Sequence, residues 1–377
     1  MSSNGKTKAA WDSMPGFKES VPGLLAIVII AIFCQLPGLP WPVTIHHLLQ
    51  YIDNILPPIN GRGLFIDLLH FNYVVICLIA GILIRNVIGV PKSWEKGLTY
   101  YSIFLHAGII MLGSQYLLRD MAKLGGTTIV IMVVFVFGGC ALMVFVGRLF
   151  KLEPSLTGIL AAGIGVCGVT AAVATAPMVR AKNEQITYAI ACSVSFGLIC
   201  LVALPPLARA LGIDQYSFGV LSATGVPNTA QVIATGYMYG FEAGKVAGFV
   251  NIGRIVLIPA AAMWIYFLSM TSDIVGSEKI SIIKTITEKF PIYVLGFIFV
   301  WILNCFHLFP KPAVFAMDKV MIWFFSLSFV GLGMQTNLRD VWRAGIMGMV
   351  VGYIIGAIKL GAAIGVIFLA IKYGWMG

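Results

Sequence analysis

The stretch "GIGVCGVTAAVATAPM", residues 163–178, lies inside a long apolar segment and decides how the rest of the chain is interpreted. It holds three glycines, a cysteine, two threonines and a proline within the length of one membrane crossing. Glycine weakens a helix and proline removes a backbone donor, whereas every backbone group in hydrocarbon needs a hydrogen-bond partner. The segment is therefore either a helix packed closely against its neighbours or a broken helix that lines a binding site.

The composition places the chain in a membrane. Of its 377 residues 59% are hydrophobic and 11% are charged, whereas soluble domains carry roughly 25% charged residues. The net charge of +10 is scattered through short loops, which is typical of an oriented membrane protein and does not indicate a nucleic-acid partner. We therefore predict an all-α polytopic membrane protein that lies in a lipid bilayer and holds no cofactor.

The seven cysteines all fall within apolar segments, without the CxxC spacing of a disulfide framework or a metal site. They are Cys34, Cys77, Cys140, Cys167, Cys192, Cys200 and Cys305. We interpret them as small packing residues and expect no bound metal.

Eleven apolar segments are long enough to cross a bilayer of about 30 Å as helices. They cover residues 21–37, 65–86, 97–117, 125–147, 155–179, 186–207, 216–238, 244–269, 290–306, 313–335 and 342–371. The predicted domains are a cytoplasmic tail (1–20), a first helix with an external or interfacial loop (21–62), a first repeat (63–211) with a broken helix at 155–179, and a second repeat (212–377) with a broken or re-entrant segment at 216–238.

Basic residues predict the orientation of these spans. With the N-terminus inside, the cytoplasmic loops hold 14 Lys and Arg and the opposite loops hold nine, which favours a cytoplasmic N-terminus and an external C-terminus. The two remaining basic residues, Arg254 and Lys359, lie within predicted spans.

An internal repeat relates two parts of the chain. "LGSQYLLRDMAKLG" (112–125) and "LGMQTNLRDVWRAG" (332–345) share seven of 14 positions without a gap. Each copy ends one span and begins the next, and an odd number of spans separates them. The copies therefore have opposite orientations, which is typical of transporters with inverted repeats.

A weaker match joins residues 165–178 to residues 225–238, with five shared positions that include Gly165/Gly225 and Thr175/Thr235. One predicted span separates the two segments, which conflicts with an inverted relation. Either one copy is re-entrant or the intervening helix is more complex than a single span, and the sequence leaves this open.

Two broken helices near the middle of the membrane would expose half-helix N-termini, each with free N–H donors and partial positive charge. Gly165, Cys167, Gly168 and Thr170 stand at one break, and Pro227, Asn228, Thr229 and Gln231 stand at the other. Close helix packing is the alternative for a lone glycine-rich span. The second copy, with amide side chains at matching depth, favours a binding site, because buried amides are costly without partners.

Arg254 has apolar neighbours and no acidic residue within a helical turn, and Asn251 lies three residues earlier on the same face. Either an anionic substrate balances its charge, or it snorkels or pairs with a distant acid such as Asp67 or Asp318. Lys359 is ambiguous between substrate binding and holding broken backbones together. Because the two broken segments contain no Asp, Glu or His, the pattern favours an anion over a cation.

Three motifs together resemble the sulfate exporter family of YeiH-type membrane proteins. They are "VCGVTA" (166–171), "AQVIA" (230–234) and the segment from Arg254 through Pro259, and the resemblance covers residues 63–370. It implies a bacterial cytoplasmic-membrane carrier of small sulfur oxyanions, with an architecture similar to that of cation:proton antiporters, in which a lysine such as Lys359 can hold broken backbones together.

The chain departs from this family at two places. Pro227-Asn228 stands where members tend to have His-Glu, and Asn251 stands where a lysine is common. These changes remove a titratable pair and one positive charge, so an organic sulfonate or another less charged anion is the hypothesis for the substrate.

The function predicted is secondary transport of a small anion, with a proton or sodium as a candidate coupling ion and a homodimer as a candidate assembly. A sodium/proton-type antiporter on the same scaffold is the alternative, although it needs an acid at the crossing. A membrane enzyme with Cys167 as nucleophile is the third hypothesis. We do not expect it, because His46, His47, His70, His106 and His307 all lie outside the motifs.

Overall fold

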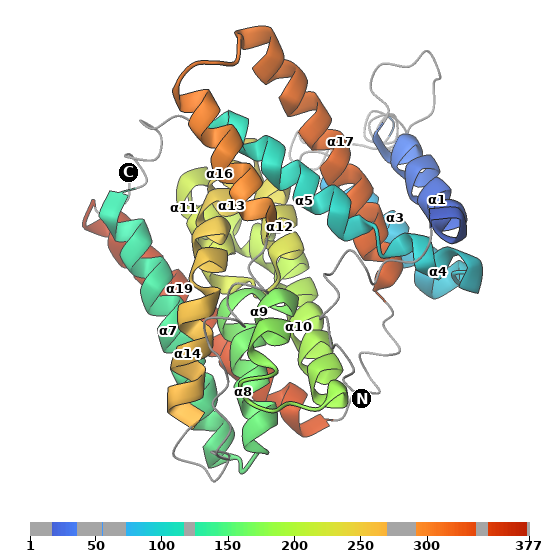
Figure 1. Cartoon of the computed structure of the whole chain (residues 1–377). Coiled ribbons are helices and arrows are strands. Elements are labelled where there is room, and N and C mark those ends of the chain that lie inside the picture. The colour runs from blue at the N-terminus through green and yellow to red at the C-terminus, as the bar shows by residue number, and fades with distance from the viewer. Residues whose placement is uncertain are drawn as a thin grey trace, which may run out of the picture.

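The computed structural model describes residues 17–35, 55, 73–116, 125–269, 292–336 and 346–374 (Figure 1). These residues form helices joined by short turns, and there is no strand among them. Residues 1–16 of the predicted tail (1–20) and most of the predicted loop within 21–62 lie outside the described residues, whereas residues 17–20 already belong to the first helix, Phe17–Gln35.

The helices follow the predicted spans closely, with additional breaks. In chain order they are α1 (Phe17–Gln35), α3 (Tyr73–Leu83), η2 (Ile84–Ile88), α4 (Lys92–Leu98), α5 (Tyr101–Leu112), η3 (Gly113–Gln115), α7 (Gly125–Leu149), α8 (Pro154–Ala162), η4 (Gly163–Cys167), α9 (Val169–Thr175), α10 (Asn183–Ala210), α11 (Gln215–Gly225), α12 (Thr229–Tyr239), α13 (Phe241–Val256), α14 (Ile258–Ser269), α16 (Ile292–Cys305), α17 (Lys311–Gln335) and α19 (Ile346–Lys372).

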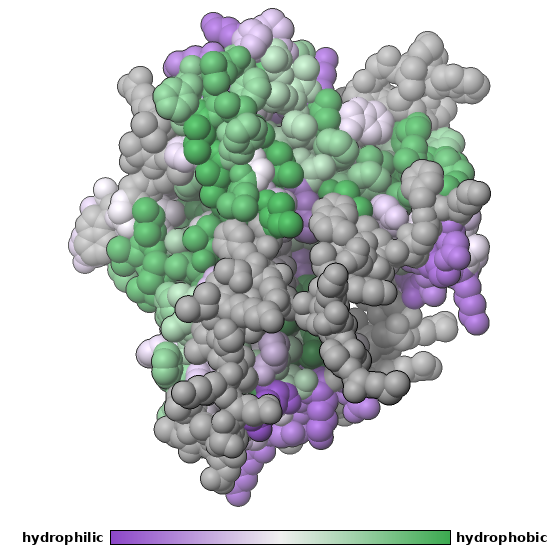
Figure 2. All heavy atoms as spheres, in the orientation of Figure 1, coloured by the Kyte–Doolittle hydropathy of each residue, from purple (hydrophilic) through white to green (hydrophobic). Residues whose placement is uncertain are grey.

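The prediction of an all-α polytopic membrane protein is confirmed. Within the described residues five helices are long and apolar enough to cross a membrane, and α13 with α14 makes a sixth as a pair bent by 52°. Shorter apolar helices lie at Glu19–Cys34, Ile76–Ile88, Pro154–Cys167 and Ile292–Cys305. Figure 2 shows hydrophobic residues over much of one face, with hydrophilic residues gathered toward its upper and lower ends.

The described helices form two bundles that meet along α12 and α13 (Figure 1). In the α17 bundle, α17 packs against α3 and α5, with α1, α4 and α16 around them. The α10 bundle contains α7 to α14 and α19. Aromatic rings join the bundles: the rings of Tyr237 and Phe325 lie 5.5 Å apart, and those of Tyr116 and Phe249 lie 5.3 Å apart.

The helices that lead into the two copies of the strong repeat, α5 and α17, run in opposite directions, as the predicted inversion requires. Gly108 of α5 packs on the ring of Phe325, and Gly331 near the end of α17 meets Tyr101 at the start of α5. Each copy ends its helix at a glutamine and continues in extended or near-extended backbone. The arginine and aspartate pairs of the repeat, residues 119–120 and 339–340, lie outside the described residues.

The backbones of α3 and α17 touch at two glycines. A Cβ at Gly81 would lie 2.9 Å from the Cα of Gly333 and would also meet the carbonyl of Val330. Both obstacles are backbone atoms, so the two helices would have to separate to make room for a methyl group.

We predict that Gly81→Ala destabilises the protein by about 1–3 kcal/mol, because overpacking costs this much in a well-packed interior. The matched control is Gly138→Ala, since a Cβ at Gly138 of α7 would meet nothing within 4 Å. Alanine is the better helix former, so the control should keep or raise the stability. Thermal unfolding in detergent compares the two variants, and equal midpoints would contradict the close approach.

Residues 154–179 double back on themselves and form the first hairpin, with α8 and η4 as one arm and α9 in the other. A Cβ at Gly158 would come within 2.7 Å of Val179, so the beginning and the end of the segment are neighbours. The turn falls at Gly168, whose φ of +67° is a conformation that other L-residues rarely adopt.

Residues 215–239 form the second hairpin, with α11 and α12 as its arms. The Ser222 hydroxyl of one arm donates to the Val232 carbonyl of the other at 2.9 Å. At the open end the rings of Phe218 and Tyr239 stack with centroids 3.9 Å apart. The second arm begins where Asn228 accepts a hydrogen bond from the backbone N–H of Ala230, so its side chain caps α12.

The two hairpins enter from opposite ends of α10, a helix of 28 residues that is about 42 Å long. At its start Gln185 donates to Ser155 of the first hairpin at 3.0 Å. At its end Arg209 donates to the carbonyls of Met238 and Tyr239 of the second hairpin, at 3.1 and 2.9 Å.

This arrangement corrects the span count, in which residues 155–179 cross the membrane once. The break itself is where the sequence predicts it, but the chain returns to the end of the bundle from which it came. Residues 216–238, which the sequence leaves open, return as well. Two hairpins from opposite ends with one helix between them have an inverted relation, so the conflict over the weaker repeat disappears.

Candidate functional site

The tips of the two hairpins touch in the interior of the α10 bundle. A Cβ at Gly168 would lie 3.2 Å from the Asn228 Nδ2 and 3.3 Å from the Asn228 Cα. These residues are equivalent in the weaker repeat, because each immediately precedes the second arm of its hairpin, α9 at Val169 and α12 at Thr229. The structure thus brings together the two breaks that the sequence predicts to form one site.

Arg254 of α13 reaches the tip of the second hairpin and is buried, with 1% of its surface exposed. Its Nη1 donates to the carbonyls of Ala223 and Val226, the second at 3.0 Å, and its Nη2 donates to that of Pro227 at 3.1 Å. The last carbonyls of a helix lack intrahelical partners and carry partial negative charge. Arg254 therefore caps the end of α11. Its predicted role as a substrate ligand stays a prediction. The Nε of Arg254 would be the donor to the substrate, since it is buried and has no hydrogen-bond partner.

Lys359 of α19 caps the end of the first arm in the first hairpin. Its Nζ donates to the carbonyls of Ile164 and Gly165, at 3.1 and 2.9 Å, where the first arm ends. Its stem passes close to Gly139 of α7, where a Cβ would lie 3.3 Å from the Lys359 Cδ. Each hairpin thus has one buried cation at the carbonyl end of its first arm.

These two cations have no acidic partner in the part of the chain that the structure describes. Arg254 and Lys359 are the only charged side chains buried there. The ion pairs among the described residues join Arg85 to Glu95, Lys96 to Glu19 and Lys245 to Glu242, all with an exposed carboxylate. A buried charge is costly when it is not paired, so the region where the hairpins meet carries an excess of positive charge.

Several buried polar atoms of α12 and α13 also have no hydrogen-bond partner. They include the Thr229 hydroxyl at the start of α12 and both amide atoms of Asn251, which lies on the same face of α13 as Arg254 and is fully buried. An unsatisfied buried donor costs about 1–3 kcal/mol. These atoms are therefore available for a bound molecule or for water.

The remaining predicted residues have structural contacts. Gln231 donates to the Val194 carbonyl of α10 at 2.8 Å and occupies the space beside Gly197, so it fastens the second arm to α10. Gly165 lies against Cys140, where a Cβ would come 2.6 Å from the sulfur. Thr170 is half-buried in the first turn of α9.

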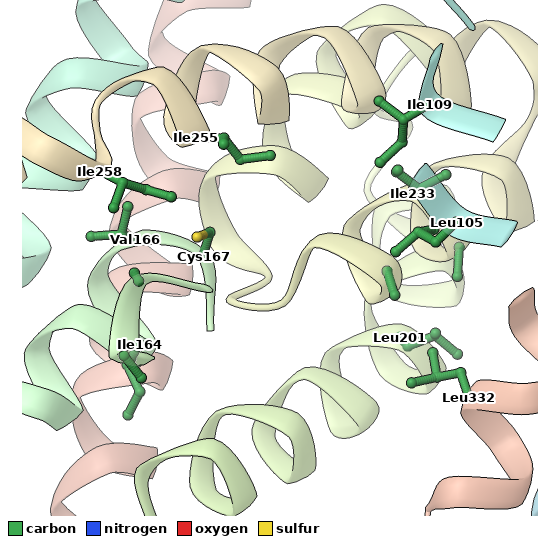
Figure 3. Packing of buried hydrophobic residues seen from close by; sticks show 14 of the residues in the cluster. Leu105, Ile109, Ile164, Val166, Cys167, Leu201, Ile233, Ile255, Ile258 and Leu332 are labelled. Atoms are coloured by element: carbon green, nitrogen blue, oxygen red, sulfur yellow. The ribbon is translucent and has the colours of Figure 1, made fainter. Parts of the chain in front are cut away.

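Cys167 lies at the first tip in apolar surroundings. Figure 3 shows Val166 and Cys167 with Ile255 and Ile258, which flank the bend between α13 and α14. Of the described histidines, His106 stacks on Tyr293 at 3.9 Å in the α17 bundle, and His307 lies at the end of α16. Neither lies in a hairpin.

Sequence reasoning missed the partner carbonyls of Arg254 and Lys359. One signal was present: each hairpin has one buried cation on a helix that follows it in the chain, and the two broken segments have no acid. A cation without an acidic neighbour in hydrocarbon needs a backbone partner, and a broken helix supplies one.

Residues 22–352 match the family model described as "Conserved hypothetical protein 698". A "UPF0324 membrane protein" of Nitratidesulfovibrio vulgaris (strain Hildenborough) is 34% identical, over 93% of this chain and 93% of its own length. A second from the same organism is 32% identical over 90% and 92%, and one from Clostridium tetani is 25% identical over 81% and 88%. No solved structure matches the chain.

Proposed function

The chain belongs to the family described as "Conserved hypothetical protein 698" and is a multi-pass membrane protein, and from this premise we propose that it is a secondary transporter of a small anion. In this proposal the anion binds where the two hairpin tips meet. Access alternates between the two sides of the membrane as one bundle moves against the other.

The observation that carries the proposal is the pair of buried cations without acidic partners. Arg254 and Lys359 offset the partial negative charge at the ends of two half-helices, and each leaves a net positive charge behind. The start of α12 adds partial positive charge and backbone donors on the same side. A bound anion would balance this positive charge, whereas a bound cation would add to it.

The unpartnered side chains suggest how the anion is held. Thr229 offers a hydroxyl, Asn251 offers an amide and Arg254 offers its Nε–H, all buried and without a partner. Hydrogen bonds to a charged group are roughly twice as strong as those between neutral groups. This set of donors suits an oxyanion.

The resemblance to the sulfate exporter family narrows the class of anion. We propose a small sulfur oxyanion or sulfonate as the substrate, carried across the bacterial cytoplasmic membrane by a protein with its N-terminus inside. Pro227-Asn228 and Asn251 favour the less charged members of this class, because they stand where family members tend to have a titratable pair and a lysine.

A sodium/proton-type antiporter on the same scaffold is the alternative. It requires a carboxylate at the point where the hairpins cross. Neither described hairpin tip contains an aspartate or a glutamate, and the buried side chains of the α10 bundle that surround them contain none. The anion is therefore the better supported substrate.

The test is thermal stabilisation of the purified protein by sulfate, thiosulfate and methanesulfonate, each compared with chloride. A ligand at 100 times its dissociation constant stabilises by about 2.7 kcal/mol. We predict that Thr229→Val removes most of this response and leaves the melting point without anion unchanged, because the hydroxyl has no partner to lose.

The matched control is Thr235→Val on the same helix. Its hydroxyl is also buried without a partner, but it lies almost two turns away from the tip. This variant should keep the full anion response. If none of the three sulfur anions shifts the melting point, or if both valine variants respond alike, the proposed site is wrong.

A further inference from the structure

Asp318 lies two turns into α17, at the interface between the two bundles. Its Oδ1 is buried and has no hydrogen-bond partner, and the Tyr73 hydroxyl of α3 is buried and unpartnered as well. One turn further along α17, Met321 meets the Tyr237 hydroxyl of α12, with sulfur and oxygen 3.9 Å apart. A carboxylate in a membrane span is costly and usually marks a functional position.

A lysine on the other bundle lies in the neighbourhood of this carboxylate. Lys245 of α13 lies over the ring of Phe241, and that ring lies 5.9 Å from the ring of Tyr237, which meets Met321 one turn from Asp318. At this separation the ammonium of Lys245 acts electrostatically on the carboxylate of Asp318. Lys245 is held in place by Glu242, at 2.9 Å, and by the ring of Phe241, at 5.1 Å. Its backbone carbonyl also accepts a hydrogen bond from the Tyr116 hydroxyl.

The other charged groups and the histidine described around α17 have partners of their own or lie at its far end. Lys319, next in the chain, lies over the ring of Phe315 at 4.5 Å. On α5, His106 stacks on Tyr293 of α16. The charged residues of η2 and α4 belong to the far end of α17, where Asn86 donates to the carbonyl of Thr336.

We propose that Asp318 is a proton-binding site that couples protonation to the contact between the two bundles. This rests on the proposed transport function, for which it supplies the coupling ion. A proton from water adds to a carboxylate oxygen and gives the neutral acid, with no other bond made or broken. The carboxylate attracts Lys245 across the interface, and the neutral acid does not. Proton binding therefore loosens the α17 bundle from α13, the helix that carries Asn251 and Arg254.

The first experiment measures proton binding directly, without any substrate. Infrared difference spectra of the full-length protein are recorded between acidic and alkaline pH, and the band of a protonated carboxylic acid is followed. We expect Asp318→Asn to remove one such band. The matched control, Glu184→Gln, changes an exposed carboxylate at the start of α10 and should leave that band in place. A spectrum of Asp318→Asn identical to that of the wild type overturns the proposal.

The second experiment measures the coupling. Hydrogen exchange in α12, α13 and the first half of α17 is followed against pH and corrected for the intrinsic pH dependence of exchange. The corrected protection should change with pH in the wild type and stay flat in Asp318→Asn; a flat profile in the wild type overturns the coupling. Asp318→Asn should keep the thermal response to sulfur anions. A lost anion response with an intact Asp318 band would count against the anion site and not against the proton site.

Discussion

Replacement of Arg254 by methionine should lower the free energy of unfolding by about 3–5 kcal/mol, the largest effect expected from a single side chain in the site. The variant keeps much of the length of the side chain but leaves the carbonyls of Ala223, Val226 and Pro227 without donors. Because these carbonyls belong to buried residues, they lose charge-assisted hydrogen bonds that no other described side chain supplies. Unfolding in mixed detergent micelles measures the loss.

Hydrogen exchange shows which helices lose stability in this variant. In Arg254→Met the second hairpin, α11 with α12, should lose protection first, while the first hairpin keeps it. Arg254→Lys should be intermediate, since one ammonium group cannot reproduce the planar fork that spans three carbonyls. If Arg254→Met is as stable as the wild type and loses only its response to anions, then Arg254 is a substrate ligand and not a cap.

Replacement of Lys359 by methionine should cost about 2–4 kcal/mol, because two charge-assisted hydrogen bonds disappear and the carbonyls of Ile164 and Gly165 stay buried. Protection should now fall in the first hairpin, α8 with η4 and α9. The same unfolding and exchange measurements apply, so the two variants can be compared directly.

Lys372→Met is the matched control, since this lysine lies on the same helix and is exposed near its end. It should leave both stability and exchange unchanged. Loss of protection in the second hairpin instead of the first would contradict the assignment of Lys359. In the double variant the costs are expected to depart from additivity, because the two tips touch through Gly168 and Asn228.

Much of the fold can be predicted from the sequence because it depends on local composition. Apolar segments of the right length mark the helices, and glycine and proline mark where they break. The weaker repeat places residue 168 opposite residue 228, and the structure shows both residues immediately before the second arm of a hairpin. The two residues are equivalent because the backbone of both hairpins has the same order of first arm, turn and second arm.

The direction of the chain after each break cannot be predicted in this way. A helix that is interrupted and continues has the same composition as one that is interrupted and returns. Whether the chain continues or returns depends on contacts between residues that are distant in the sequence, such as Gln185 with Ser155 and Arg209 with Tyr239. For the same reason the sequence shows that Arg254 is buried in hydrocarbon but not which groups it meets.

The two hairpins also change which loops share a side of the membrane. A segment that returns to its entry side does not carry the following residues across, so Arg180 and Lys182 stay with Arg148 and Lys151. Arg209 moves to the opposite face by the same reasoning. In the predicted topology the count of basic residues then becomes 15 against eight instead of 14 against nine. The difference in Lys and Arg between the two sides, which sets the orientation of a membrane protein, is therefore larger when the hairpins are not counted as crossings.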